Sequence, residues 1–174
     1  YYSWFGRIDR DKGLIQLIKT MTKHKIALKL SGPIIEHDYW SSVLQPLIEE
    51  SNYVDYVGNL DKKNLDEFVG KSNGLLYSSR KSHSYGLTLK ETLACGTPII
   101  AVKNEVSEGI INKDVGRFFL LEDEASLLKA LKEVGDLSRS DCLQHSKDYS
   151  YHKIMGNKYE SLYVKVALPR VKVV

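Results

Sequence analysis

Short hydrophobic runs alternate with amphipathic segments along the whole chain, and this alternation restricts the possible folds more than any other feature. Six runs have the length and composition of β-strands: residues 1–6, 26–30, 54–57, 74–77, 98–102 and 116–121. They read as unbroken hydrophobic stretches, which is typical of strands covered on both faces. The sequence therefore predicts an α/β fold built on a Rossmann-like, doubly wound, mostly parallel six-stranded sheet.

The segments between these runs have helical spacing. Leu14, Leu17, Ile18 and Met21 recur every three or four residues, as the buried stripe of a helix does. Pro46 interrupts the second of these segments, and Asp61 is expected to cap the third. The chain after the sixth strand is expected to be helical and to end in a long helix over residues 151–167. The other helices are expected at residues 37–50, 61–69, 87–93, 106–111 and 124–134.

The length and composition of the chain fit one soluble domain. A chain of 174 residues with 43% hydrophobic content can bury a real core. Its net charge of +3 favours a phosphate-sized anionic partner over nucleic acid. No apolar run approaches the roughly 18 residues of a membrane span, and the opening residues show no signal-peptide pattern. Cys95 and Cys142 are spaced for neither a disulfide framework nor a metal. We therefore expect a cytoplasmic protein. Because the chain opens directly on a strand, we also expect a fragment of a longer protein.

The first candidate site is the loop after the first strand, GRIDRDKG at residues 6–13. Arg7 and Lys12 bracket a turn that leads into a helix, and a guanidinium, an ammonium and a helix N-terminus together can hold a diphosphate. The alternative is that both cations pair with Asp9 and Asp11 as solvated loop charges. The loop lacks the G-x-G-x-x-G dinucleotide fingerprint, and it is not a Walker A loop either.

The second candidate site is the stretch HSYGLTLKE at residues 83–91. Gly86 lets the backbone approach a ligand, and the helix that follows directs the N–H groups of Leu87 and Thr88 outward. Glu91, one turn further on, can accept two hydrogen bonds from the hydroxyls of a ribose. The alternative is that Glu91 is a surface residue paired with Lys90 or Lys129.

Two further features are ambiguous by themselves. Residues 31–33, Ser-Gly-Pro, either form the floor of a nucleotide pocket or make a simple turn. His83 is either a loop residue or a ligand contact, and it shows no metal-ligand spacing with the other histidines. We expect no metal site that includes His24, His37, His145 or His152.

In combination, these loops resemble the C-terminal, nucleotide-sugar-binding domain of GT-B-fold glycosyltransferases, most closely glycosyltransferase family 4. That family shows Gly-Arg, four residues and Lys-Gly in its first loop, as in GRIDRDKG here. It shows a Gly-Pro turn after strand two and a Val-x-x-x-Gly third strand, here VDYVG at residues 54–58. It also shows two Glu residues separated by seven around an aromatic-Gly pair, and the matching stretch is HSYGLTLKETLACGTPIIAV. The similarity runs in order from residue 1 to about residue 165.

The resemblance implies the C-terminal half of a GT-B glycosyltransferase, with residues 1–174 as a single donor-nucleotide-binding domain and the N-terminal acceptor domain absent. It implies retaining transfer of a hexose from a UDP- or GDP-sugar to a glycan, lipid or other acceptor, with no cofactor and no obligatory metal. The implied partners are the nucleotide sugar and the N-terminal domain. Arg7 and Lys12 would act on the donor diphosphate and Glu91 on the ribose, and the other implied donor-binding residues are His83, Tyr85, Gly86, Leu87 and Thr88.

Two positions depart from the family pattern. His83 occupies the place of the first Glu, eight positions before Glu91, so the preference for a particular donor sugar cannot be inherited. After the fifth strand, Lys103-Asn104-Glu105 replaces the usual pair of glycines, which affects the acceptor side. The loss of the first Glu favours one alternative, a degenerate nucleotide-sugar-binding module without catalysis, and a GT-B-fold epimerase or phosphorylase of similar fold is another. A phosphorylase would need a pyridoxal lysine, for which the sequence has no motif.

The last segment of the chain is rich in basic residues. A solvated helix face is the simpler interpretation, and peripheral contact with an anionic membrane surface, on the inner face of the membrane, is the alternative. The residues concerned are Lys153, Lys158, Lys165, Arg170 and Lys172.

Overall fold

The computed structural model describes residues 1–80, 85–149 and 156–167. Its six strands form one sheet in the order β3-β2-β1-β4-β5-β6, and every neighbouring pair is parallel. This confirms the predicted doubly wound α/β fold and makes the sheet entirely parallel. The strands are β1 (Tyr2–Phe5), β2 (Leu28–Ser31), β3 (Val54–Tyr56), β4 (Leu75–Tyr77), β5 (Ile99–Val102) and β6 (Gly116–Phe119).

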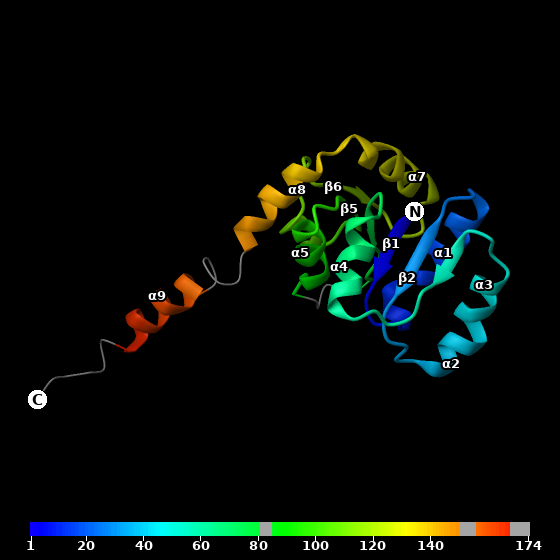
Figure 1. The fold of residues 1–174 in the computed structure, drawn as a ribbon, viewed down its shortest axis with the longest axis horizontal. Helices are drawn as coiled ribbons and strands as arrows, with labels where there is room; N and C mark the ends of the chain where they lie inside the picture. Colours follow the sequence, from blue (N-terminus) through cyan, green and yellow to red (C-terminus); the bar gives the residue numbers. More distant parts are fainter. Residues whose placement is uncertain (81–84, 150–155, 168–174) are drawn as a thin grey trace, which may run out of the picture.

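Helices cover both faces of the sheet (Figure 1), with α1 and α3 on one side and α4 and α5 on the other. One core cluster joins α1, α7 and the turn around Leu44 to the strands, and a second joins α5 and α8 to β4 and β5. The described helices are α1 (Leu14–Lys23), α2 (His37–Tyr39), α3 (Gln45–Glu49), α4 (Lys62–Gly70), α5 (Leu87–Ala94), α6 (Glu105–Glu108), α7 (Glu124–Glu133), α8 (Arg139–Ser146) and α9 (Gly156–Ala167).

Local sequence explains most of these boundaries. The predicted stripe of α1, Leu14, Leu17, Ile18 and Met21, is buried in full. The Asp61 carboxylate accepts a hydrogen bond from the Asn64 N–H at 2.9 Å, which confirms the predicted cap of α4.

The expected helix over residues 37–50 is present, but it is not regular. A π turn spans Trp40–Leu44 and joins α2 to α3. The Gln45 N–H donates to the Trp40 carbonyl five residues back, so the backbone widens just before Pro46. Since proline has no N–H and its ring crowds the preceding turn, the wider turn allows the helix to continue through it.

The end of the chain differs from the expectation in two ways. The sequence did not delimit α8, because Cys142 is the one buried residue of that helix and its apolar pattern is weak. The expected last helix is described only from Gly156, since residues 151–155 lie outside the described residues. The described side chains of α9 are exposed. No helix in the described part of the chain has the length and apolar character needed to cross a membrane.

The loops after β1, β2 and β3 meet backbone to backbone. The Gly6 N–H donates to the Ser31 carbonyl at 3.1 Å, and the Gly32 N–H donates to the Gly58 carbonyl at 3.1 Å. A Cβ on Gly32 would lie 1.9 Å from the Gly6 oxygen, and its φ of +141° is unfavourable for any other residue. Glycine at position 32 therefore permits the contact between these loops.

Replacing Gly32 by alanine should lower the free energy of unfolding by roughly 2–4 kcal/mol, because overpacking and backbone strain add. Gly135→Ala is the matched control, since no atom lies within 4 Å of its added Cβ and its φ is not in the left-handed region. Urea unfolding measures both variants, and we expect the control to change stability by less than about 0.5 kcal/mol. Equal effects in the two variants would contradict this account of the loop contact.

Candidate functional site

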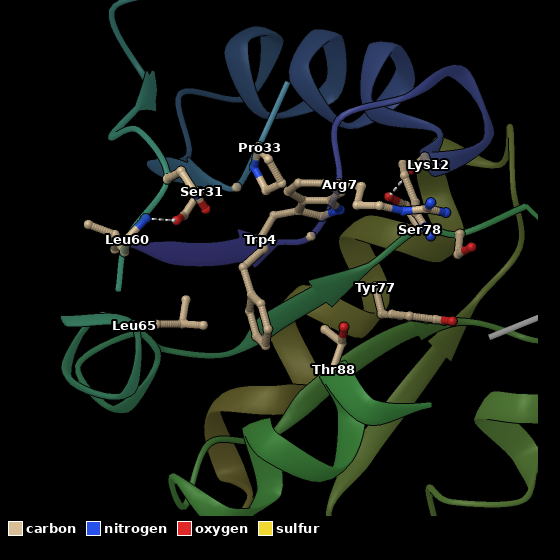
Figure 2. A pocket seen from close by; sticks show the side chains of 15 residues that line it. Trp4, Arg7, Lys12, Ser31, Pro33, Leu60, Leu65, Tyr77, Ser78 and Thr88 are labelled. Carbon is tan, nitrogen blue, oxygen red and sulfur yellow. Dashed lines mark hydrogen bonds between the residues drawn. The ribbon is translucent and has the colours of Figure 1, made fainter. Parts of the chain in front are cut away.

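A cavity of about 390 Å³ lies at the carboxyl ends of β1, β2 and β4 (Figure 2). The strand order reverses between β1 and β4, which is where parallel sheets of this kind bind ligands. The volume of this cavity is in the range of small-molecule binding sites. The lining residues are Trp4, Phe5, Gly6, Arg7, Lys12, Ser31, Gly32, Pro33, Asn59, Leu60, Leu65, Tyr77, Ser78, Ser79 and Thr88.

The loop after β1 brings both of its predicted cations to this cavity. Arg7 and Lys12 both line it. The loop is fixed to the end of β4, because the Ser78 hydroxyl donates to the Lys12 carbonyl at 2.5 Å and the Arg80 N–H donates to the Asp11 carbonyl at 2.8 Å. Gly13 turns the chain into α1 with a φ of +64°.

The carboxylates of the loop neutralise these cations only weakly. Arg7 reaches Asp9 at 3.8 Å with two thirds of its side chain exposed, a geometry that contributes little in water. Within the described residues, no ion pair involves Lys12, although the alternative interpretation paired it with the loop acids. Asp9 instead caps the 3-10 turn Arg10–Lys12 by accepting from the Asp11 N–H. The cavity wall therefore carries two cations available to an anion.

The start of α5 forms the opposite wall. Thr88 lines the cavity, and Gly86 is the N-cap of α5 without any side-chain hydrogen bond to the first turn. Among the described residues, no acceptor takes the N–H groups of Leu87 and Thr88, so an external acceptor can bind them. Tyr85 and Leu87 are exposed beside it, and the ammonium of Lys90 lies 4.0 Å from the centre of the Tyr85 ring.

Gly86 is required for a reason that the sequence did not indicate. Its φ is +71°, and an added Cβ would lie 2.3 Å from Ile110 Cδ1 and 3.1 Å from Val106 Cγ1. The close approach that glycine permits is therefore to the segment after β5, and this contact holds the start of α5 in place.

Glu91 does not line the cavity. It borders a second hollow of about 290 Å³ between α4 and α5, together with Lys62, Asp66, Ala94 and Cys95. The alternative ion pairs for Glu91 are also not formed, since Lys129 pairs with Glu133 at 3.9 Å and Lys90 lies over Tyr85. His83 lies outside the described residues. The structure thus brings Arg7, Lys12 and Thr88 together and leaves Glu91 one helical turn away on α5.

Sequence reasoning missed several lining residues. Ser78 and Ser79 directly follow β4, and their position after a buried strand was the available signal. Trp4 read as an ordinary core residue of β1, and it is indeed only 3% exposed. Asn59 and Leu60 follow the glycine that ends the third predicted strand.

Among the described residues, no group of three or more His, Cys, Asp or Glu side chains is arranged to hold a metal ion.

Comparison with known proteins gives consistent matches. Residues 3–148 match the family model described as glycosyl transferases group 1. The chain is 30% identical over 171 residues to the N-acetyl-alpha-D-glucosaminyl L-malate synthase of Bacillus anthracis, covering 94% of this chain and 40% of that protein. It is 27% identical over 119 residues to a phosphatidyl-myo-inositol mannosyltransferase of Propionibacterium freudenreichii, covering 63% of this chain and 30% of that protein.

Solved structures agree on the fold. The Anabaena protein HepE in complex with UDP and glucose superimposes with a TM-score of 0.78 at 19% identity, over 92% of this chain and 47% of that one. A sucrose-phosphate synthase from Thermosynechococcus elongatus superimposes with a TM-score of 0.75 at 22% identity, over 94% of this chain and 46% of that one. The fold is thus that of one half of these GT-B glycosyltransferases. The chain spans less than half the length of these relatives.

The two thiols should differ in reactivity. Burial raises the pKa of the Cys142 thiol to about 11, so its reactive thiolate is scarce below that pH. Burial also raises the pKa of Cys95, which is only half-buried and borders the hollow beside Glu91. We expect iodoacetamide at pH 8 to modify Cys95 slowly in the native protein and Cys142 only after unfolding, as peptide mass spectrometry would reveal. Faster modification of Cys142 would contradict this packing.

Proposed function

The chain belongs to the glycosyl transferases group 1 family, and from this membership we propose that it is the donor-binding half of a retaining glycosyltransferase. The substrate is a UDP- or GDP-hexose, and the hexose passes to a glycan, a lipid or another acceptor. The observation that carries this proposal is the pair Arg7 and Lys12, which line one cavity at the point where the strand order reverses.

In this proposal Arg7 and Lys12 bind the diphosphate of the donor. When the bond between the sugar C1 and the diphosphate oxygen breaks, negative charge grows on that leaving group. Two cations held in advance on a fixed loop stabilise this charge without reorganising at the moment of reaction. A hydroxyl of the acceptor forms the new bond to C1, its proton passes to the departing diphosphate oxygen, and C1 keeps its configuration overall.

The start of α5 contributes the second part of the proposed donor site. The N–H groups of Leu87 and Thr88 hold phosphate or sugar oxygens in this proposal, with Tyr85 and Gly86 beside them. Glu91 binds the ribose hydroxyls. Both hollows are bordered by α4 and α5, through Leu65 and Thr88 for the cavity and through Asp66 and Glu91 for the second hollow. In this proposal one nucleotide extends from the cavity into the second hollow.

The proposed whole enzyme needs an N-terminal domain that binds the acceptor. The exposed face of α9, formed by Tyr159, Leu162, Tyr163 and Val166, is apolar at helical spacing and is suited to pack against such a domain. The 174-residue chain alone should therefore bind nucleotide and transfer nothing. A reducing compartment, the cytoplasm, belongs to the same proposal, since Cys95 and Cys142 are both free thiols.

Titration with UDP, GDP and ADP, with the unfolding temperature as the readout, tests the donor site. We expect one nucleotide to bind with a dissociation constant of about 0.1–1 mM, because charge-assisted hydrogen bonds are offset by ordering costs. At 100 times that constant the ligand should stabilise the fold by about 2.7 kcal/mol, a shift of several degrees. The Arg7→Ala, Lys12→Ala double variant should lose the shift.

The matched control is the double variant Lys19→Ala, Lys132→Ala, which removes the same charge from two exposed residues that do not line the cavity. It should keep the full nucleotide shift. If the control loses the shift as well, general electrostatic attraction explains the binding and the diphosphate site is refuted. The absence of a shift with any of the three nucleotides would refute the donor-binding function itself.

A degenerate binding module is the second candidate, favoured by His83 in place of the first Glu of the family pattern. The test uses the chain joined to its N-terminal half and compares the native sequence with His83→Glu. We expect the native protein to release nucleoside diphosphate from a UDP- or GDP-sugar when acceptor is present, since the cationic diphosphate site is intact. An inert native protein together with an active His83→Glu variant would establish the degenerate module instead.

A further inference from the structure

Arg10 lies between the two proposed diphosphate ligands, and it does not line the cavity. Its contacts lead to the segment after β2. The Arg10 N–H donates to Glu36 Oε1 at 3.0 Å, and the guanidinium Nε lies 3.0 Å from Glu36 Oε2. The guanidinium also lies 4.7 Å from the centre of the Tyr39 ring. One carboxylate thus holds both the main chain and the side chain of Arg10.

The main chain reinforces this link. Ile8, fully buried, donates its N–H to the Pro33 carbonyl at 2.9 Å, and its own carbonyl accepts the Ile35 N–H at 3.2 Å. Ile8 and Ile34 form an isolated parallel bridge that extends the β1–β2 pairing beyond the strands. The side of the loop near Arg7 is therefore tied to the segment after β2, and the side near Lys12 is tied through Ser78 to the segment after β4.

The 3-10 turn Arg10–Lys12 connects these two anchored parts. Glu36 fixes the start of that turn, and the direction of the turn determines where Lys12 lies relative to Arg7. Both partners of the ion pair are exposed, with side-chain exposures of 63% for Arg10 and 38% for Glu36. Such a pair contributes little to global stability, so its effect should be local.

We propose that Glu36 is a positioning residue that holds Arg7 and Lys12 at the spacing of a diphosphate. This inference rests on the proposed donor site and adds a residue to it. Glu36 acts through Arg10 and touches no ligand. Without it, the turn is free to reorient, and the loop must be ordered at the moment of binding, which weakens affinity for the anion.

The test measures binding of inorganic pyrophosphate, and of the nucleoside diphosphate found by titration, to the 174-residue chain. Glu36→Ala should weaken both affinities about five- to tenfold, because one charge-assisted contact is lost together with the order that it gives the loop. Glu36→Gln retains an oxygen that accepts the Arg10 N–H, so it should recover most of this loss and weaken binding by only about twofold. The melting temperature of the free variants should stay within about 2 °C of the native value.

Glu124→Gln is the matched control, because Glu124 also pairs with two basic groups, Lys23 and His24, is similarly exposed and lies outside the cavity. It should bind both probes as the native chain does. Native affinity in Glu36→Ala, or an equal loss in Glu124→Gln, would overturn the positioning role. Binding of pyrophosphate but of no nucleotide by the native chain would refute the donor function while leaving the role of Glu36 to be judged from pyrophosphate. Binding of neither probe would overturn both.

Discussion

The contact between Gly6 and Gly32 is the constraint on which the site depends. The loops after β1 and β2 touch through their backbones, and the loop after β3 joins them through the Gly32 N–H and the Gly58 carbonyl. A side chain at position 32 would separate them. Because they meet, Arg7, Pro33 and Leu60 border one cavity although they come from three different loops. A backbone contact thus determines the shape of a wall whose function is attributed to its side chains.

Strand order then determines which loops face each other. Since β1 has β2 on one side and β4 on the other, the loop that carries Arg7 and Lys12 lies beside the residues that directly follow β4. Ser78 and Arg80 bind that loop through the carbonyls of Lys12 and Asp11. The backbone that carries Arg7 and Lys12 is thus held in place before any ligand arrives, which is the condition for the proposed electrostatic stabilisation of a leaving group.

Much of this could be predicted from local patterns, and the rest could not for a physical reason. The strand runs, the stripe of α1 and the cap at Asp61 depend on neighbouring residues, and each was correct. The bond from Ser78 to Lys12 joins residues 66 apart, and the pair of Arg10 with Glu36 joins residues 26 apart. No local pattern specifies such partners. Gly86 was identified for the conformational freedom of its backbone, but the side chain of Ile110, which requires a glycine there, lies 24 residues further along the chain, after α6.

Amide chemical shifts, recorded as the chain is titrated with the nucleoside diphosphate that it binds, test the central claim most directly. If the cavity between β1 and β4 is the donor site, the largest changes should occur in residues 6–13, 31–33, 58–60 and 86–89, whose backbones surround it. The hollow lined by Asn112, Asp141 and His145 should remain unchanged. Changes concentrated around Asn112, Asp141 and His145, with none in residues 6–13, would contradict the assignment of the donor site to this cavity.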